Sequence, residues 1–383
     1  MEEKLKRRDF MSRLSVGIFS LIALPYKGIS KSFEKEPEQN SSAMIIIDPI
    51  LKIKPMGFQW ETSDPFLFCV HHEDKFPKGN SAMEPVASLK GRHIGEDFII
   101  KDGWRMYHGQ TIPGFPGHPH RGFETITVVR EGIVDHADSL GASGRYGDGD
   151  VQWMTAGKGV QHSEMFPLIY EDKENPMELF QIWLNLPKKN KMVEPHFKML
   201  WSSSIPKYKH KDLKGFETEV EVIAGSINNY TATSPPPDSW ASDLHNEVAI
   251  WNIKMQPGAN FIIPKASIGI NRTIYFYIGK NIQIANKSIE EYHALEVISE
   301  VEIEINNGDT EARLLILQGK PIGEHVIQYG PFVMNTKDEI KQAFEDYHQT
   351  QFGGWPWPRP DQVHKRETGR FALHADGTKE IGS

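Results

Sequence analysis

Short apolar runs separated by turn residues constrain the fold of this 383-residue chain more than any other feature. From about residue 45 onward, runs rich in β-branched residues, such as 125–129 and 219–224, are interrupted by Gly, Pro, Asn and Asp. This spacing is typical of strands joined by turns in sandwiches and barrels. The length allows about two or three domains. We therefore expect an all-β protein with more than one domain.

One segment near the C-terminus has the pattern of a helix instead. Thr336 is placed to cap the first turn, and Glu339 follows three residues later, as in a capping box. An apolar stripe at helical spacing is formed by Ile340, Phe344 and Tyr347. We expect a short helix that lies outside the barrels.

The chain beyond this helix has a different character. Residues 355–360 read Trp-Pro-Trp-Pro-Arg-Pro. Proline has no backbone N–H, so this stretch cannot pair as a central strand. We expect an extended tail that wraps the surface.

Composition narrows the possible functions. The formal net charge of −8 argues against a surface that coats nucleic acid. Cys69 is the only cysteine, so no internal disulfide can form, and any metal site must be built from histidine and carboxylate ligands. Attention therefore turns to the sixteen histidines.

The first residues have the pattern of a targeting segment. A basic start that includes Arg7 and Arg8 is followed by an apolar run at 14–24. A membrane span needs about 20 apolar residues, so this run is too short, and residues 1–30 are typical of a signal peptide, with 31–44 as a polar linker. The arginine pair resembles a twin-arginine signal. We expect export to the periplasm with no transmembrane span in the mature chain; a plain basic leader would leave the protein in the cytoplasm.

Two ligand-type pairs stand out in the first half of the chain. His118 and His120 are separated by one residue, as are His162 and Glu164, and positions i and i+2 share a face of a strand. A single His-x-His pair in a β protein is more often a surface or packing pair. Two such pairs on neighbouring strands supply four ligands, a set that suits Fe(II), Mn, Ni, Cu or Zn rather than Ca or Mg.

The other histidines do not show this pairing. His71 and His72 are adjacent, so they point to opposite faces of a strand, while His93, His108 and His136 stand alone. We interpret all five as surface or hydrogen-bonded positions.

The residues around the two pairs resemble the pirin family. Segments 118–125 and 150–164 carry the closest likeness, and together with the flanking matches it extends over roughly 66–352. The flanking segments with the same likeness are 106–109, 115–117, 321–324 and 328–335.

This resemblance implies a bicupin, which is a pair of tandem cupin (jelly-roll) β-barrels. It places an N-terminal metal-binding cupin at 45–190, a C-terminal cupin without metal at 191–335, and a helix with an extended tail at 336–383. In the second half, neither 269–276 nor 308–317 contains a ligand pair at the expected spacing. One metal, in the first lobe of a monomer, is the expectation.

Pirins bind one mononuclear iron, and the matching ligand positions here are His118, His120, His162 and Glu164. Some members have quercetin 2,3-dioxygenase activity, which implies an oxidoreductase that opens a flavonol or another small enolisable aromatic substrate, with Glu164 as catalytic base. Other members are redox-sensitive regulators that bind protein partners, and this non-enzymatic role is the alternative. The export signal departs from the usual intracellular location of the family.

The identity of the carboxylate ligand needs a choice. Glu124 follows His120 at the spacing where ordinary cupins carry a glutamate ligand. The resemblance and the matched pairs favour Glu164, which leaves Glu124 as the acceptor for an imidazole N–H behind the ligands. Flat apolar walls for a substrate are expected from three aromatic residues, Phe115, Phe123 and Trp153, although strand aromatics are more often plain core.

Overall fold

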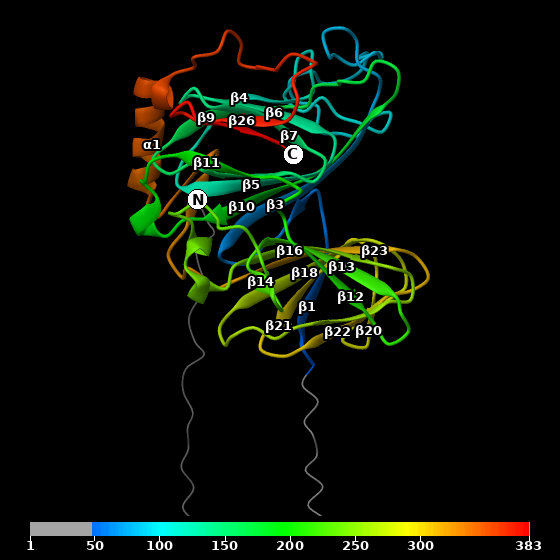
Figure 1. Ribbon diagram of the computed structural model, residues 1–383. Coiled ribbons are helices and arrows are strands. Elements are labelled where there is room, and N and C mark those ends of the chain that lie inside the picture. Colours follow the sequence, from blue (N-terminus) through cyan, green and yellow to red (C-terminus); the bar gives the residue numbers. More distant parts are fainter. Residues whose placement is uncertain (1–47, 383) are drawn as a thin grey trace, which may run out of the picture. The chain divides into compact units, whose positions relative to one another are not determined.

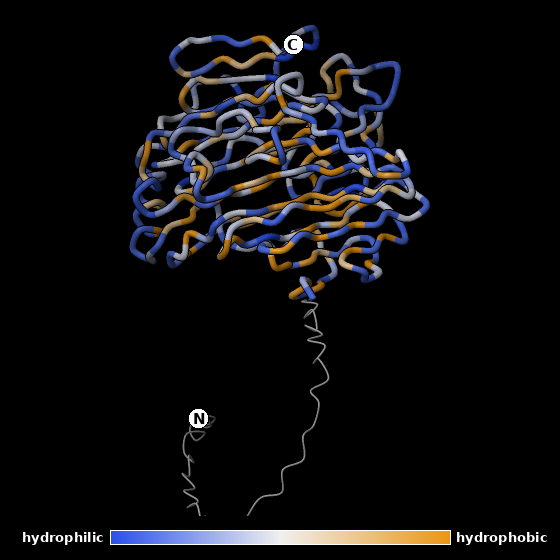
Figure 2. The backbone as a smooth tube through the Cα atoms, turned by 60° about the horizontal axis from the view of Figure 1, so that its bottom comes forward, coloured by the Kyte–Doolittle hydropathy of each residue, from blue (hydrophilic) through white to orange (hydrophobic). Residues whose placement is uncertain are grey.

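The computed structural model describes residues 48–382 (Figure 1), so the expected signal peptide and linker lie outside the described residues. The described chain is composed mainly of strands. Apolar residues are concentrated along the strands, while many connecting loops are polar (Figure 2). The predicted all-β fold of two barrels is confirmed.

The first barrel is made of two six-stranded sheets. One sheet has the order β11-β8-β5-β10-β3-β2 and the other has the order β27-β26-β7-β6-β9-β4. The bounds in the first sheet are β2 Gln59–Trp60, β3 Phe66–Phe76, β5 Phe123–Glu131, β8 Val151–Thr155, β10 Asn175–Asn185 and β11 His196–Leu200. Those in the second sheet are β4 Gly114–His120, β6 Ile133–Asp138, β7 Ser143–Gly147, β9 Val160–Met165, β26 Phe371–Leu373 and β27 Lys379–Ile381.

The second barrel combines a seven-stranded sheet, β1-β21-β18-β23-β16-β13-β12, with a four-stranded sheet, β17-β22-β19-β20. In the larger sheet the bounds are β1 Ile50–Pro55, β12 Lys207–Lys211, β13 Glu217–Ala224, β16 Ala249–Met255, β18 Asn271–Ile278, β21 His293–Ile298 and β23 Ala312–Gly319. In the smaller sheet they are β17 Asn260–Ile263, β19 Ile282–Ile284, β20 Lys287–Ile289 and β22 Ile303–Asn306. Two small hairpins complete the strands: β14 Ser226–Ile227 with β15 Tyr230–Thr231, and β24 Ile327–Tyr329 with β25 Phe332–Met334.

The predicted helix is confirmed as α1, Lys337–Thr350. Thr336 and Glu339 form the reciprocal capping box, and the helix contacts the first barrel through the ion pair of Arg121 with Asp346 and the hydrogen bond of Tyr347 to Gln161. Short 3₁₀ turns occupy Lys188–Asn190, Trp240–Ser242, Leu244–Asn246 and Gln351–Gly353. Within residues 48–382 no helix combines the length and apolar character that a membrane crossing requires.

Strand membership departs from the expected domain bounds at both ends of the chain. β1, which the sequence assigned to the first lobe, pairs with β21 of the second barrel, and β11 at residues 196–200 belongs to the first barrel. The end of the expected tail does not run as a single unpaired segment. Its strands β26 and β27 form a hairpin, and β26 pairs with β7 of the first barrel. Pairing satisfies the backbone groups of a sheet edge. Long-range pairing of this kind leaves no signal in the local sequence.

Buried side chains fall into separate cores. One cluster fills the second barrel and includes Trp251, Phe261 and Ile303. Another joins the two barrels, since it combines residues such as Ile126 of β5 with Tyr275 of β18. The first barrel has its own cluster, but part of its interior is lined by polar residues and by a cavity.

Candidate metal centre

The two predicted ligand pairs lie on neighbouring strands. β4 and β9 run antiparallel, and His118 is directly opposite His162. The imidazole centroids of His118 and His162 are 4.5 Å apart, and His120 lies 4.8 Å from His118 and 5.0 Å from His162. One ring nitrogen from each of the three lies within 4.8 Å of the others. The structure therefore brings three imidazoles together at one point.

All three imidazoles are in the form that can bind a metal. Burial lowers the pKa of His118 to about 4 and holds the pKa values of His120 and His162 well below the usual value. Neutral rings keep a free lone pair at neutral pH. Nδ1 of His118 donates to the carbonyl oxygen of Pro116 at 2.9 Å, which leaves Nε2 for a ligand bond.

His162 provides an independent test of whether the site fits a metal. Both of its ring nitrogens are buried and neither has a hydrogen-bond partner. A buried polar atom without a partner is costly and needs an explanation. Coordination of an ion by one of these nitrogens, together with His118 and His120, supplies an explanation for that nitrogen, and the donor set is that of a transition-metal site. The residues present fit a single metal ion.

Glu164 lies beside the three imidazoles. Its Oε2 is 4.0 Å from Nε2 of His162. The hydroxyl of Thr127 donates to Oε1 at 2.8 Å, and the side-chain amide of Gln181 donates to Oε2 at 3.2 Å. Burial raises the pKa of the Glu164 carboxyl, and the hydrogen bond from Thr127 opposes that shift. The carboxylate is thus held in a fixed orientation next to the histidines.

A cavity of about 260 Å³ opens onto this group. His118, His120 and Glu164 form part of its wall. The remaining wall is largely apolar and aromatic, and it includes Phe58, Phe68, Phe98, Phe115, Phe166 and Trp183. A concave apolar site that ends on a few polar groups is the usual form of a small-molecule binding site.

The three aromatic residues expected in the pocket have different positions. Phe115 lines the cavity. Phe123 is buried behind the ligands, with its ring centroid 5.1 Å from that of His120 and 4.3 Å from that of Trp183. Trp153 packs in the core that joins the two barrels, on the other face of its sheet. Only Phe115 is placed to touch a ligand in the cavity.

The prediction that Glu124 supports an imidazole is wrong. Its carboxylate accepts hydrogen bonds from the hydroxyls of Thr155 at 2.7 Å and Ser239 at 2.5 Å. The reason is strand parity: Thr127 faces the cavity, so Glu124 lies on the opposite face of β5 with Ile126. The turn at Gly122, with φ of +85°, resets the parity that the spacing from His120 suggested.

The other five histidines are hydrogen-bonded or exposed, as predicted, but two of them have a further role. His93 is exposed, and His71 is hydrogen-bonded to Glu178 at 3.2 Å. His72 is hydrogen-bonded to Tyr107 and His108 to the carbonyl oxygen of Gly95, and both also line the cavity. His136 is fully buried with its ring centroid 5.5 Å from that of His162, and its Nε2 donates to Asp138 at 3.2 Å.

Several residues of the site were missed in the sequence. Thr127 and Gln181 orient Glu164, and Trp183 contributes to the cavity wall. The sequence did contain a signal for Thr127 and Gln181, because each is a polar residue within a largely apolar stretch of its strand. Phe58 and Phe98 come from loops and carried no such signal.

Comparisons with known proteins agree with this architecture. The profile of the pirin family matches residues 57–184, and that of the pirin C-terminal cupin domain matches 250–353. Human pirin is 36% identical over 286 residues, which are 70% of this chain and 90% of that protein. A pirin-like protein of Caulobacter vibrioides is 36% identical over 249 residues, or 63% of this chain and 81% of that protein.

A solved structure shares the fold as well. The crystal structure of quercetin 2,3-dioxygenase from Acinetobacter baumannii superposes with a TM-score of 0.62 at 25% identity, and covers 80% of this chain and 98% of that chain. The ligand strands β4 and β9 lie inside the first matched segment, and the second segment lies in the other barrel and α1. With both barrels matched and relatives aligned over nearly their full length, the chain belongs to the pirin family.

Proposed function

We propose that this protein is a metal-dependent dioxygenase that opens a flavonol or a related enolisable aromatic ring with O₂. The observation that carries the proposal is the cavity, whose aromatic wall ends on the neutral imidazoles of His118 and His120 and on the Glu164 carboxylate, with the His162 imidazole clustered beside them. A flat apolar ring fits such walls, and the polar end is where an acidic hydroxyl of the ring can react.

The ion we propose is Fe(II), held by His118, His120, His162 and Glu164, with Mn, Ni, Cu or Zn as the other candidates. When bound, such an ion supplies an open position for the enol oxygen of the substrate and for O₂.

Glu164 is the residue that we propose removes the hydroxyl proton. Thr127 and Gln181 hold its carboxylate, so the oxygen atoms cannot turn away from the cavity. Burial raises the pKa of this carboxyl, which makes the carboxylate a stronger base. Loss of the proton gives the enolate, whose ring carbon is the electron-rich centre that reacts with O₂.

The cavity wall performs the remaining tasks. Phe58, Phe115 and Trp183 present aromatic surfaces that can hold a planar ring against the polar end. Because these surfaces are apolar, they also exclude water from the enolate.

Oxygen uptake by iron-loaded protein with quercetin tests this function. We expect consumption of O₂ in proportion to loss of substrate, and none with zinc-loaded protein, because zinc has no redox chemistry. Elemental analysis of freshly purified protein, done first, identifies the resident metal. Iron-loaded protein that binds its metal fully and consumes no O₂ would contradict the enzyme and favour a redox-sensing role.

A further inference from the structure

His72 faces the metal cavity from the neighbouring strand. Along β3, Phe68, Val70 and His72 alternate onto the cavity side, whereas His71 points the other way and is bound to Glu178. β3 pairs with β10, so that Val70 is opposite Gln181 and His72 is opposite Leu179. His72 is therefore a diagonal neighbour of the residue that orients Glu164, at about 7–8 Å between backbones.

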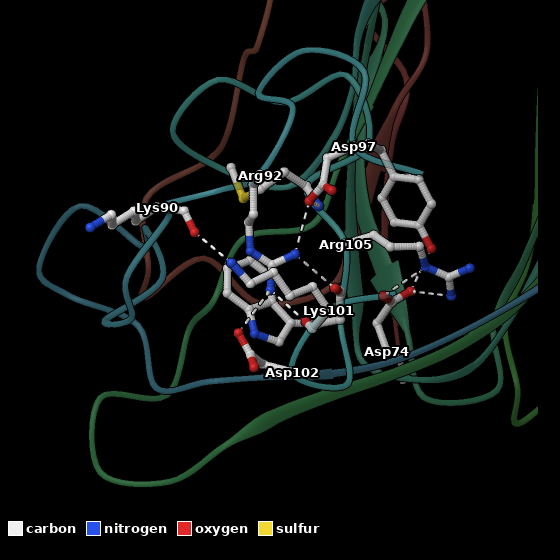
Figure 3. Close-up of polar contacts among 10 residues, drawn as sticks. Asp74, Lys90, Arg92, Asp97, Lys101, Asp102 and Arg105 are labelled. Atoms are coloured by element: carbon white, nitrogen blue, oxygen red, sulfur yellow. Dashed lines mark hydrogen bonds and ion pairs between the residues drawn. The ribbon is translucent and has the colours of Figure 1, made fainter. Parts of the chain in front are cut away.

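A chain of buried polar groups fixes the state of the His72 ring. Arg105 donates to both carboxylate oxygens of Asp74, each at 3.0 Å, and these two side chains face each other in Figure 3. The hydroxyl of Tyr107 donates to Asp74 as well. Tyr107 has only one proton to give, so its oxygen is the acceptor for Nδ1–H of His72 at 2.9 Å.

The consequence is a defined tautomer. With the proton on Nδ1, the Nε2 atom of His72 is an acceptor and is the ring nitrogen left for a ligand in the cavity. Burial and the nearby Arg105 charge lower the pKa of His72 to about 3, so the ring stays neutral. Within the described residues, the hydrogen bond of the His72 ring is made by Nδ1, and no donor is bonded to Nε2.

The loop that contains Tyr107 is fixed by several contacts within it. Residues 77–113 join β3 to β4, and a connection this long in a compact domain usually serves a binding site. Arg92 donates to Asp97 at 2.9 Å (Figure 3). Its guanidinium carbon also lies 3.6 Å from the centroid of the Trp104 ring. The backbone of Asp97 is bridged to that of Tyr107 in both directions, at 2.9 and 3.0 Å.

We propose that His72 accepts, at Nε2, a hydrogen bond from a second hydroxyl of the aromatic substrate, other than the hydroxyl that reacts beside Glu164. The inference rests on the proposed function and narrows its substrate class to ring enols that carry at least one further hydroxyl. A purely structural histidine needs no fixed tautomer with an unpaired acceptor nitrogen in the wall of a cavity. The polar chain from Arg105 to His72 provides one.

The test measures flavonoid binding to zinc-loaded protein in the absence of O₂. Quenching of tryptophan fluorescence reports the binding. The probes are quercetin and 3-hydroxyflavone, which share the enol edge but differ in their other hydroxyls. We expect wild-type protein to prefer quercetin by about 10-fold or more, since a site built for a hydroxyl rejects a ligand without it. His72→Phe should remove this preference and leave the affinity for 3-hydroxyflavone within about threefold.

Matched variants separate the role of the acceptor from a general loss of structure. His71→Phe makes the same change on the opposite face of the strand and should keep the preference. His72→Gln restores an acceptor and should recover part of it. Tyr107→Phe leaves His72 in place but frees its tautomer, so the preference should fall by about threefold, and this variant carries the test if His72→Phe does not fold.

The two proposals can fail separately. If wild-type protein binds neither flavonoid, the proposed function falls and this inference falls with it. If wild-type protein binds both and the ratio is the same in His72→Phe and Tyr107→Phe, only the role of His72 is overturned.

Discussion

The two barrels have the same strand plan but different interiors. The order β4-β9-β6-β7 in the first barrel corresponds to β17-β22-β19-β20 in the second. Where β4 and β9 carry the two candidate ligand pairs, β17 and β22 carry Phe261, Ile263, Ile303 and Ile305, all buried. This correspondence also corrects the sequence interpretation, which sought the equivalent strands at 269–276 and 308–317.

The comparison shows that the strand arrangement alone does not determine whether a barrel contains a binding site. In the second barrel, the side chains on β17 and β22 join an apolar cluster that fills the interior, and their burial stabilises the fold. In the first barrel the same places hold polar groups whose burial is costly unless they find partners. A few inward positions therefore convert a packed core into a binding site.

The largest expected effect comes from truncating one inward side chain in each barrel and comparing the results. His162→Ala should reduce the metal content from about one ion to near zero, because it removes one ligand and an ion held by fewer ligands dissociates. Ile303→Ala in the second barrel should keep the metal and lower the free energy of unfolding by about 2–5 kcal/mol. Elemental analysis and denaturant unfolding measure the two quantities. Full metal content in His162→Ala would show that the ion binds elsewhere.

The two buried glutamates of the first barrel allow a comparison between the cavity side, where Glu164 lies, and the side toward the second barrel, where Glu124 lies. Glu164→Gln keeps the shape of the side chain but removes its basicity, so turnover should fall by about 10²–10⁴-fold and metal binding should weaken. Glu124→Gln should leave both nearly unchanged, because the partners of Glu124 are hydroxyls on the face toward the second barrel. Steady-state oxygen uptake and metal titration compare the pair. The opposite order of severity would give the ligand role to Glu124.

A smaller effect follows from the charge state of Glu124. Burial raises its pKa to about 7 in the folded protein, above the ordinary value of 4.5. The folded state then binds the proton more tightly than the unfolded state, so stability is greatest below pH 4.5 and declines as the pH rises through 7. The full difference is roughly 3 kcal/mol. The pKa of His118, lowered to about 4, produces the opposite slope between pH 4 and 6.5.

Subtraction isolates the contribution of Glu124. The free energy of unfolding of metal-free wild type and of Glu124→Gln is measured by denaturant titration from pH 5 to 8. We expect the difference between the two to change by a few kcal/mol, in favour of the variant at high pH. A difference that does not vary with pH would show that Glu124 titrates normally in the folded protein.

Local sequence was sufficient for some of these features and not for others. The ligand strands were predictable because two i, i+2 pairs reveal both the strand and its inward face, and the capping box of Thr336 revealed α1. The face of Glu124 was not predictable, because the turn at Gly122 resets the alternation. The role of His72 depends on Tyr107, thirty-five residues away in the sequence and held by a loop. Contacts of this kind exist only in the folded chain.

The smallest expected effect on either barrel comes from the leader. The proposed ligands and both barrels lie within residues 48–382, so we expect changes at Arg7 and Arg8 to leave the ligand set intact. We propose that this arginine pair directs export by a route that carries folded proteins, which suits a site assembled from distant strands. Replacing both with Lys keeps the charge but not the guanidinium fork that a receptor reads. We expect metal-loaded, unprocessed protein to remain inside the cell, whereas the wild type is exported. Cell fractionation, with metal analysis of the recovered protein, compares the two. Wild-type protein that stays in the cytosol with Met1 intact would contradict export and would favour an intracellular sensor over an exported enzyme.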